Sequence, residues 1–525
     1  MNLELYDTTL RDGAQQSGIS LSLKDKINIT LKLDDLGINT IEGGYAGSNP
    51  KDDEYFKLIQ KENLKNAKIS AFGSTRKPNS KIDTDIIVKA MLSSEAKVLA
   101  VVGKSSSKQV ERVLETTLDE NLTMILETIS YLVQRDRRVV FDAEHFFDGF
   151  NTNRNYALRT LQTAIDAGAE IVTLCDTNGG MIPADIQKII SDVKNFGIDQ
   201  KNIGIHCHND TDTAVACTLM AYDQGVNHIQ GTINGYGERC GNANLISIIG
   251  NLQLKKGVEI LSQNKLRMLT ELSNFVSDTV NRTPFAYAPY VGSKAFTHKG
   301  GMHASAVNKY VESYQHMDPE IVGNSSNITV SELAGRSNII TRLRELKIHE
   351  EYSPQDIKNL TSIIKDKENN GFSFETAAAS LELLLKKHKN LIKSPFELKD
   401  YSIVLKNSSD IPEDDKCEAK LNITVNNEVR NASAKGNGPV AALDKALREA
   451  LSYYYPELIN IKLTDYKVRV VNESEATESI VRVSIESADN KTVWTTTGAS
   501  PNIIEASWMA LSDSMEWWLT NNTND

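Results

Sequence analysis

Asn202-Ile203-Gly204-Ile205-His206-Cys207-His208-Asn209-Asp210 is an apolar run that ends in a cluster of polar residues. The apolar part, Asn202–Ile205, predicts a buried β-strand, and the side chains of a strand alternate between its two faces. His206 and His208 are therefore expected to project from the same face, and Cys207 from the opposite one. Two imidazoles on one face at the end of a strand form half of a candidate divalent-metal site.

This run is one of eight short, β-branched stretches that alternate with segments of helical periodicity. The eight are Leu3–Tyr6, Thr40–Gly43, Lys68–Phe72, Val98–Val102, Arg138–Phe141, Ile171–Leu174, Asn202–Ile205 and His228–Thr232. Between them lie amphipathic segments such as Lys24–Leu36 and Val110–Leu132. Alternating strands and helices predict parallel strands, and eight units in about 240 residues are typical of a (β/α)8 TIM barrel. An open doubly wound sheet is the alternative, but Asp7–Gly13 is not the glycine fingerprint of its dinucleotide-binding form.

The rest of the chain changes character twice. From about Asn251 to Asp400 the pattern is mainly helical, with loops expected around Pro284–Lys299 and Asp318–Asn327. Beyond about Lys399 the pattern predicts strands at Tyr401–Leu405, Ala419–Val425, Tyr466–Val471 and Ser479–Ile485. These segments predict a helical middle region and a third region of mixed α+β structure.

The C-terminal region contains one pattern twice. A strand leads through a turn that ends in proline into a helix, first over Thr424–Leu451 and again over Ser484–Met515. The two turns are Gly436-Asn437-Gly438-Pro439 and Gly498-Ala499-Ser500-Pro501, and the helices are Val440–Leu451 and Asn502–Met515. Proline suits the first position of a helix. The duplication predicts an α+β module with an internal pseudo-repeat.

The composition is that of a soluble globular protein, with 40% hydrophobic and 24% charged residues. A net charge of −11 argues against a nucleic-acid partner. The five cysteines form no CxxC pair, which favours reduced thiols in the cytoplasm over a disulfide framework. The first strand begins within the first few residues, which leaves no room for a signal peptide, and no apolar run approaches the ~18 residues of a membrane helix.

The active site of a TIM barrel lies at the C-terminal ends of its strands. The reactive residues at the predicted strand ends are Arg11, Asp12, Glu42, Glu144, His145, Asp176, Thr177, His206, His208, Asn234, Glu238, Arg239, Asn242 and Asn244. Asp12 with the two histidines would give two nitrogens and one oxygen, a donor set that suits Zn²⁺, Mn²⁺, Co²⁺ or Fe²⁺ and leaves positions open for a chelating substrate. Histidines satisfied by hydrogen bonds are the alternative, but a pair beside a carboxylate favours a metal.

Two further strand-end residues have more than one reading. Arg11 could present its guanidinium to a carboxylate or to a developing enolate, form an ion pair with Asp7, Asp12 or Glu42, or do both. Glu144 is a candidate base or a partner of a metal ligand, and its alternatives are a second metal ligand or a structural carboxylate.

Three other features are ambiguous by themselves. Thr177 could donate its hydroxyl to a substrate carboxylate or cap a helix. The glycine-dense loop Gly231–Asn242 could hold phosphate or allow close backbone approach to a ligand, and it lacks the lysine of a P-loop. His303, in Gly300-Gly301-Met302-His303-Ala304 with Tyr310 and Tyr314 beyond it, would be unremarkable alone.

Asp7–Gln16, His206–Asp210 and Gly235–Leu245 together resemble motifs of the 2-isopropylmalate, homocitrate and citramalate synthases, acyl-CoA condensing barrels of the DRE-TIM metallolyase type. The resemblance covers essentially the whole chain. Glu42–Asp52 and Phe141–Asp148 resemble the (R)-citramalate synthase branch, which usually has Trp-Pro where this chain has Tyr-Ala at positions 45 and 46.

The resemblance implies a role for each site residue. Residues 1–270 would form the catalytic barrel, 271–398 helical linker subdomains, and 399–525 an allosteric regulatory domain of the LeuA dimerisation type, with Gly436, Gly438, Pro439 and Pro501 at its effector turns. The metal ligands would be Asp12, His206, His208 and Asn242. Arg11, Asp12 and Thr177 would bind the keto acid. Catalysis would use Arg11, Glu144, His303 and Tyr314, with Tyr310 as the alternative tyrosine, and His303 would reach the partner barrel of a homodimer.

The implied reaction is the metal-dependent condensation of acetyl-CoA with pyruvate, followed by thioester hydrolysis, to give (R)-citramalate and CoA for isoleucine biosynthesis through 2-oxobutanoate. The metal would be Mn²⁺, Zn²⁺, Mg²⁺ or Co²⁺, and isoleucine or leucine the feedback effector. The alternatives are 2-isopropylmalate synthase, homocitrate synthase and a metal-dependent acyl-CoA lyase. A biotin carboxyltransferase would need a biotinyl segment, which the sequence lacks, and a barrel that has lost activity would have a damaged site.

Overall fold

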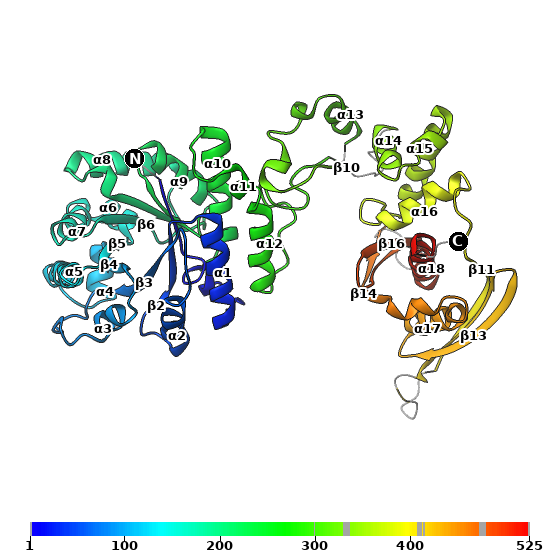
Figure 1. Cartoon of the computed structure of the whole chain (residues 1–525), viewed down its shortest axis with the longest axis horizontal. Helices are drawn as coiled ribbons and strands as arrows, with labels where there is room; N and C mark the ends of the chain where they lie inside the picture. The colour runs from blue at the N-terminus through cyan, green and yellow to red at the C-terminus, as the bar shows by residue number, and fades with distance from the viewer. Residues whose placement is uncertain are drawn as a thin grey trace. The chain divides into compact units, whose positions relative to one another are not determined.

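Eight parallel strands close into a barrel in the computed structural model of the chain (Figure 1), which describes residues 3–298, 300–328, 336–406, 412, 415–471 and 479–522. The strands are β1 (Glu4–Asp7), β2 (Thr40–Tyr45), β3 (Lys68–Ser74), β4 (Val98–Lys104), β5 (Arg138–Glu144), β6 (Ile171–Asp176), β7 (Ile203–Cys207) and β8 (His228–Gly231). They pair in sequence order, and β8 pairs with β1 to complete the ring. The predicted TIM barrel is confirmed, and each of its strands overlaps one of the eight predicted apolar runs.

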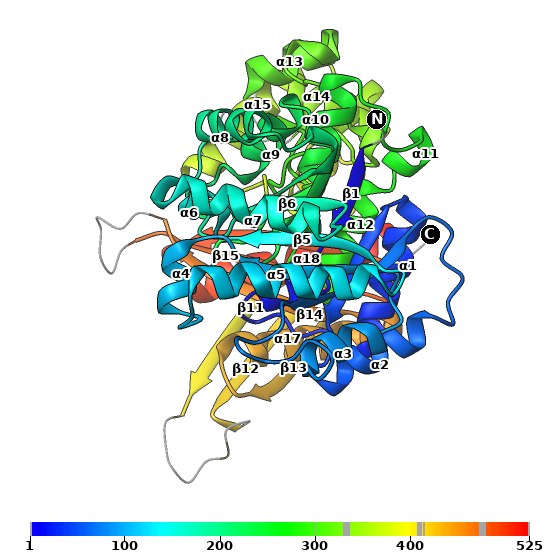
Figure 2. The same cartoon turned by 90° about the vertical axis from the view of Figure 1, so that its left-hand side faces the viewer.

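The helices between the strands cover the outside of the barrel, and Figure 2 shows α5, α6 and α7 over strands β5 and β6. They are α1 (Leu23–Leu36), α2 (Pro50–Ile59), α3 (Ile86–Ser93), α4 (Ser107–Arg112), α5 (Leu118–Val133), α6 (Phe146–Thr152), α7 (Arg154–Asp166), α8 (Pro183–Phe196), α9 (Ala214–Asp223) and α10 (Leu245–Lys256). The amphipathic segment predicted over Val110–Leu132 is not one helix, because α4 ends within it at Arg112 and α5 begins only at Leu118. Glu115 has a left-handed φ of 51°, and Thr117 then caps α5 by accepting a hydrogen bond from the Glu120 N–H at 3.1 Å.

The barrel interior contains one apolar cluster and a larger set of buried polar side chains. Tyr6, Val98, Ala100, Val140 and Ile171 belong to one buried cluster inside the ring. The buried polar side chains come from five strands and include Glu42, Asp142, Thr173, His206 and Gln230. Buried polar groups need hydrogen-bond partners, so these side chains form a network rather than a hydrophobic core.

Two compact units make up the chain, the first of residues 1–296 and 317–326 and the second of residues 297–316 and 327–525. The first unit adds α11 (Gln263–Leu266) and α12 (Leu269–Thr279) to the barrel. The loop predicted over Asp318–Asn327 contains a 3-10 turn, η5 (Pro319–Val322), whose last carbonyl accepts a hydrogen bond from the Thr270 hydroxyl at 2.7 Å. No helix in the described part of the chain has the length and apolar character that crossing a membrane requires.

The second unit begins with short elements. Strand β9 (Thr297–His298) pairs with β10 (Asn327–Ile328), and α13 (Gly301–Lys309) is followed by the 3-10 turn η4 (Val311–Ser313). Three further helices share a small core: α14 (Arg336–Glu345), α15 (Pro354–Asn369) and α16 (Ala378–His388). The predicted helical character of this region is confirmed.

The C-terminal module repeats one unit of three antiparallel strands and a helix. The first copy is β11 (Phe396–Leu405), β12 (Cys417–Val425), β13 (Glu428–Gly436) and α17 (Pro439–Ser452). The second copy is β14 (Lys462–Val470), β15 (Val481–Ala488), β16 (Val493–Ser500) and α18 (Ile503–Asn522). The predicted pseudo-repeat is confirmed, although the third strand of each copy was not among the predicted strands.

Glycines in the third strands explain part of the duplicated pattern. A Cβ at Gly436 would lie 2.8 Å from the Ala442 nitrogen of α17, and one at Gly498 would lie 2.1 Å from the Ala506 oxygen of α18. Each helix therefore packs so closely on its sheet that only glycine fits at that position. Gly438 is different, because it lies at the N-cap of α17 and a Cβ there would have no atom within 4 Å among the described residues.

Candidate active site

Asp12 and the two histidines meet at the C-terminal end of the barrel. Asp12 follows β1, His206 is the penultimate residue of β7 and His208 follows that strand. One ligand atom from each of the three lies within 4.8 Å of the others. Asp12 Oδ2 is 3.3 Å from His206 Nε2 and 3.9 Å from His208 Nε2, and all three side chains are buried. The structure thus brings together the donor set predicted from the sequence.

Asn242 joins this cluster from the loop that follows β8. Its Oδ1 lies 3.1 Å from His206 Nε2, and its backbone forms an isolated bridge with His208. The loop can approach the histidines because Gly241 adopts a φ of 94° and a Cβ there would lie 2.0 Å from the Gly235 carbonyl oxygen. Close backbone approach therefore explains at least this glycine of the 231–242 loop.

Burial and the neighbouring charges shift the pKa values of all three residues of the cluster. Burial would raise the pKa of Asp12, but Arg11 and the two histidines hold it well below its usual range. Burial would likewise lower the pKa of His206, but the hydrogen bond and charge of Asp12 raise it. Burial and the neighbouring His206 lower the pKa of His208 to about 4, which leaves this imidazole neutral, as a metal ligand must be.

Two buried atoms of the cluster lack partners. Asp12 Oδ1 and His208 Nδ1 have no hydrogen bond to any residue that the structure describes. Buried polar atoms are rarely left unpaired, so an orphaned carboxylate oxygen here indicates room for a missing partner. A carboxylate, two imidazoles and an amide oxygen are donors that a divalent cation accepts, and the residues present fit such an ion.

Arg11 is fixed by two carboxylates and an aromatic ring. Its Nε donates to Glu42 Oε1 at 2.5 Å, its Nη1 is 3.2 Å from Asp12 Oδ2, and its Cζ lies 4.0 Å from the centre of the Phe72 ring. Glu42 also accepts a hydrogen bond from the Tyr6 hydroxyl at 2.7 Å. Asp7 is not a partner, because it accepts from Thr9 instead. The predicted ion pair of Arg11 is thus formed with both Asp12 and Glu42. These two contacts keep the guanidinium next to the cluster.

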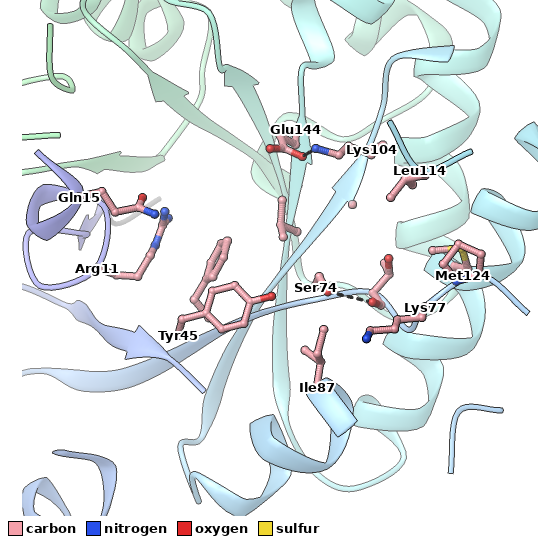
Figure 3. A pocket seen from close by; sticks show the side chains of 15 residues that line it. Arg11, Gln15, Tyr45, Ser74, Lys77, Ile87, Lys104, Leu114, Met124 and Glu144 are labelled. Atoms are coloured by element: carbon pink, nitrogen blue, oxygen red, sulfur yellow. Dashed lines mark hydrogen bonds and ion pairs between the residues drawn. The ribbon is translucent and has the colours of Figure 1, made fainter. Parts of the chain in front are cut away.

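Arg11 also lines a cavity of about 450 Å³ at the same end of the barrel. Figure 3 shows Arg11 and Gln15 on one side of this cavity and Lys104 and Glu144, the last residues of β4 and β5, on another. There Lys104 and Glu144, which are register partners on adjacent strands, form an ion pair. Glu144 is thus beside the cavity but outside the Asp12–His206–His208 cluster. The sequence prediction missed Lys104, although its place as the last residue of β4 was a usable signal.

Thr177 and its neighbours organise the loops after β5 and β6. The Thr177 hydroxyl accepts a hydrogen bond from the His145 backbone N–H at 2.8 Å, which leaves its own proton available for a ligand. The alternative of Thr177 as a helix cap is wrong, since α8 begins at Pro183 with Ile182 as its N-cap. Asp176 accepts from two backbone N–H groups, those of residues 180 and 181, and holds its own turn.

The remaining residues of the β8 loop build the scaffold. Asn244 caps α10 through the Ile246 N–H at 3.0 Å, and Asn234 donates to the Ser273 carbonyl at 2.9 Å. Arg239 forms an ion pair with Asp210 and donates to the Thr177 carbonyl at 2.7 Å. Glu238 is exposed. These contacts fix the loops around the cluster, and none of them places these side chains among its ligand atoms.

His303 and Tyr314 belong to the second unit. Their rings stack with centroids 4.0 Å apart and an interplanar angle of 21°, and both side chains are exposed. Tyr310 instead donates its hydroxyl to Glu312. The stacking favours Tyr314 over Tyr310 as the tyrosine that accompanies His303.

Three family models match successive parts of the chain. The model described as HMGL-like matches residues 2–276, more than half of the chain. The model described as homocitrate synthase post-HMGL domain-like matches residues 290–371, and the LeuA allosteric (dimerisation) domain matches residues 375–519.

Curated relatives span nearly the same length. The (R)-citramalate synthase of Aquifex aeolicus is 50% identical over 98% of this chain and 97% of its own. That of Synechocystis is 45% identical over 99% and 96% of the two chains. The 2-isopropylmalate synthase of Methanocaldococcus jannaschii is more distant, at 30% identity over 97% and 93% of the two chains.

Proposed function

The chain belongs to the (R)-citramalate synthase family, which consists of acyltransferases, and from this premise we propose how its residues divide the condensation of acetyl-CoA with pyruvate. The observation that carries the assignment is the 50% identity over nearly the whole length of the Aquifex aeolicus synthase, against 30% for a 2-isopropylmalate synthase. We assign the condensation to residues 1–270, a helical linker to 271–398 and regulation to 399–525.

Asp12, His206, His208 and Asn242 are the residues that would hold the divalent cation, whether Mn²⁺, Zn²⁺, Mg²⁺ or Co²⁺. When bound, such a cation supplies Lewis-acid polarisation of a carbonyl group. The orphaned Asp12 oxygen and the neutral His208 ring support this assignment. The rest of the chemistry falls to side chains that bind, orient or move protons.

Arg11 and Thr177 bind and orient the keto acid. The Thr177 hydroxyl, which already accepts from the His145 N–H, donates its proton to the substrate carboxylate. The Arg11 guanidinium is already in position before the reaction, because Glu42, Asp12 and the Phe72 ring hold it in place. A fixed guanidinium stabilises the negative charge that develops on the enolate oxygen of acetyl-CoA.

Glu144 and His303 share the proton transfers. A base removes a proton from the methyl group of acetyl-CoA, and the resulting enolate carbon attacks the keto carbon of pyruvate. The new alkoxide takes up a proton, and water then cleaves the thioester to release CoA and (R)-citramalate. The position of Glu144 at the wall of the 450 Å³ cavity supports its role, and the stacked Tyr314 supports that of His303.

Regulation is assigned to the duplicated C-terminal module. The match to the LeuA allosteric (dimerisation) domain supports a homodimer, in which His303 and Tyr314 serve the barrel of the partner subunit. It also supports feedback by isoleucine or leucine at the turns containing Gly436, Gly438, Pro439 and Pro501. The product would then enter isoleucine biosynthesis through 2-oxobutanoate. A metal-dependent acyl-CoA lyase, the alternative outside this class, has no evident use for such a module.

A keto-acid panel tests the assigned reaction. CoA release from acetyl-CoA is expected with pyruvate at a kcat/KM at least roughly tenfold above that with 2-ketoisovalerate or 2-ketoglutarate, because a pocket built for a methyl group resists bulkier groups. Chelation should stop the reaction and added Mn²⁺ restore it. Faster turnover of 2-ketoisovalerate would make the protein a 2-isopropylmalate synthase.

Gly438→Val tests the effector turn. The open space around Gly438 and its extended φ of −162° predict that the variant folds normally. Inhibition by isoleucine or leucine is expected to weaken about tenfold or more, because the added side chain would cover the N-terminal end of α17, where the helix dipole suits a carboxylate. The rate without amino acid should not change.

Ser452→Val, at the exposed end of the same helix, is the control and should be inhibited normally. If isoleucine and leucine inhibit Gly438→Val at the same concentrations as the wild type, the effector binds at a different part of the chain.

A further inference from the structure

Gln230 lies beneath the histidine cluster, in the middle of β8, and its side chain is completely buried. Its Oε1 accepts a hydrogen bond from His206 Nδ1 at 2.8 Å. Its Nε2 donates to Asp142 Oδ1 at 2.9 Å and to Thr173 Oγ1 at 3.2 Å. One amide thus connects a candidate metal ligand on β7 to a buried carboxylate on β5.

The orientation of this amide is determined by its partners. If the amide were flipped, its oxygen would face the Asp142 carboxylate, and two acceptors would meet without a proton between them. With Nε2 towards Asp142, the oxygen must face His206. That oxygen can only accept, so His206 carries its proton on Nδ1 and turns Nε2 towards Asp12 and Asn242.

The amide is also held from below. Its Nε2 lies 3.4 Å from His228 Nε2, and His228 Nδ1 lies 3.0 Å from Glu4 Oε2. Glu4 in turn accepts two hydrogen bonds from Arg138, each of 2.6 Å. A side chain with partners on all these sides cannot rotate without breaking several buried hydrogen bonds, which is costly.

We propose that Gln230, oriented by Asp142, is a positioning residue that fixes the ring and tautomer of His206 so that Nε2 is the nitrogen presented to the cation. Gln230 touches neither substrate nor cation and acts through His206. The inference rests on the proposed metal site. Partners of metal-binding histidines set which ring nitrogen is free to bind, and their loss typically weakens metal binding about 10- to 100-fold.

The first test compares two near-isosteric replacements of buried amides. Gln230→Met removes the acceptor for His206, whereas Asn121→Leu removes a buried amide of α5 that donates to the Lys104 carbonyl and the Tyr156 hydroxyl. Titration of each chelator-treated variant with Mn²⁺ in a calorimeter is expected to give a Kd about 10- to 100-fold weaker for Gln230→Met and unchanged for Asn121→Leu. Wild-type affinity in a folded Gln230→Met variant would overturn the proposal.

The second test exchanges the amide of Gln230 with the carboxylate of Asp142, and it remains decisive if Gln230→Met fails to fold. Gln230→Glu alone places two buried carboxylates side by side, so Mn²⁺ binding is expected to weaken. The double variant Gln230→Glu/Asp142→Asn restores one donor facing one acceptor, with the total charge unchanged. It should bind Mn²⁺ within about threefold of the wild type. A double variant that binds no better than Gln230→Glu would overturn the proposal.

The wild type and His206→Ala complete the series. If both bind Mn²⁺ equally, the proposed metal site itself is wrong, and the inference fails with it. If only the wild type binds and the Gln230 variants match it, the metal site stands and the role of Gln230 fails.

Discussion

His206→Ala is expected to reduce CoA release from acetyl-CoA and pyruvate by about a thousandfold or more, equivalent to about 4 kcal/mol of transition-state stabilisation. Nε2 of His206 lies between Asp12 and Asn242, so its loss removes the central donor of the proposed metal site. Bound Mn²⁺ per subunit should fall in parallel, measured by metal analysis after gel filtration. The barrel should stay folded, because alanine leaves no buried charge without a partner.

Cys207→Ala is the matched control for this prediction. Cys207 is the next residue of the same strand, is equally buried, and belongs to the hydrophobic core outside the ring. Its removal should leave both Mn²⁺ content and turnover near those of the wild type. Full activity of His206→Ala, with Mn²⁺ still required, would eliminate the proposed ligand set.

Arg11→Lys is expected to lower kcat by roughly 100- to 1,000-fold, the loss typical when one preorganised donor to a developing oxyanion is removed. Lysine keeps the positive charge beside Glu42 and Asp12, so no buried carboxylate is left without a cation. It lacks the planar, forked donor geometry and the stacking on Phe72 that hold the guanidinium in place. Steady-state kinetics with both substrates would measure the effect.

Arg76→Lys provides the comparison. Arg76 is also a buried arginine of the barrel, paired with Glu120 and Glu127, but it is not among the residues that line the 450 Å³ cavity. Its replacement should reduce thermal stability with little change in kcat. If Arg11→Lys keeps a wild-type kcat, the positive charge alone suffices, and the proposed role of the guanidinium geometry is wrong.

The barrel could be predicted because strands buried on both faces are almost continuous apolar runs, and eight of them alternate with helical segments. Strands β13 and β16 could not be identified in the same way. In β13 the buried positions are the small residues Ala432 and Gly436, and at Gly436 α17 packs too closely for a side chain. Small inward residues give little contrast with the polar outward ones, so the alternation that predicts a strand is weak.

The candidate site could be predicted only where one strand carries the information. His206 and His208 were identified because alternation along β7 places them on one face. Gln230 could not be, because an amide in the middle of a strand has no chemical signature. Its role depends on Asp142 and Thr173, which approach it from β5 and β6. Asn242 was among the polar residues after the last strand, but its role as a metal ligand was predicted by family resemblance alone, since its approach to His206 depends on the fold of a glycine-rich loop.

The polar layer inside the barrel also limits how the enzyme can be redesigned. Libraries that seek new keto-acid preferences usually vary cavity walls, and here that wall includes Phe72, which supports Arg11. Positions well below the wall are coupled as well, because Arg138 and Glu4 lie at the end of the hydrogen-bonded series that reaches His206. A stabilising substitution at Arg138, chosen as remote from the chemistry, would alter the support of a proposed metal ligand, so thermostability screens of this barrel should record metal affinity alongside Tm.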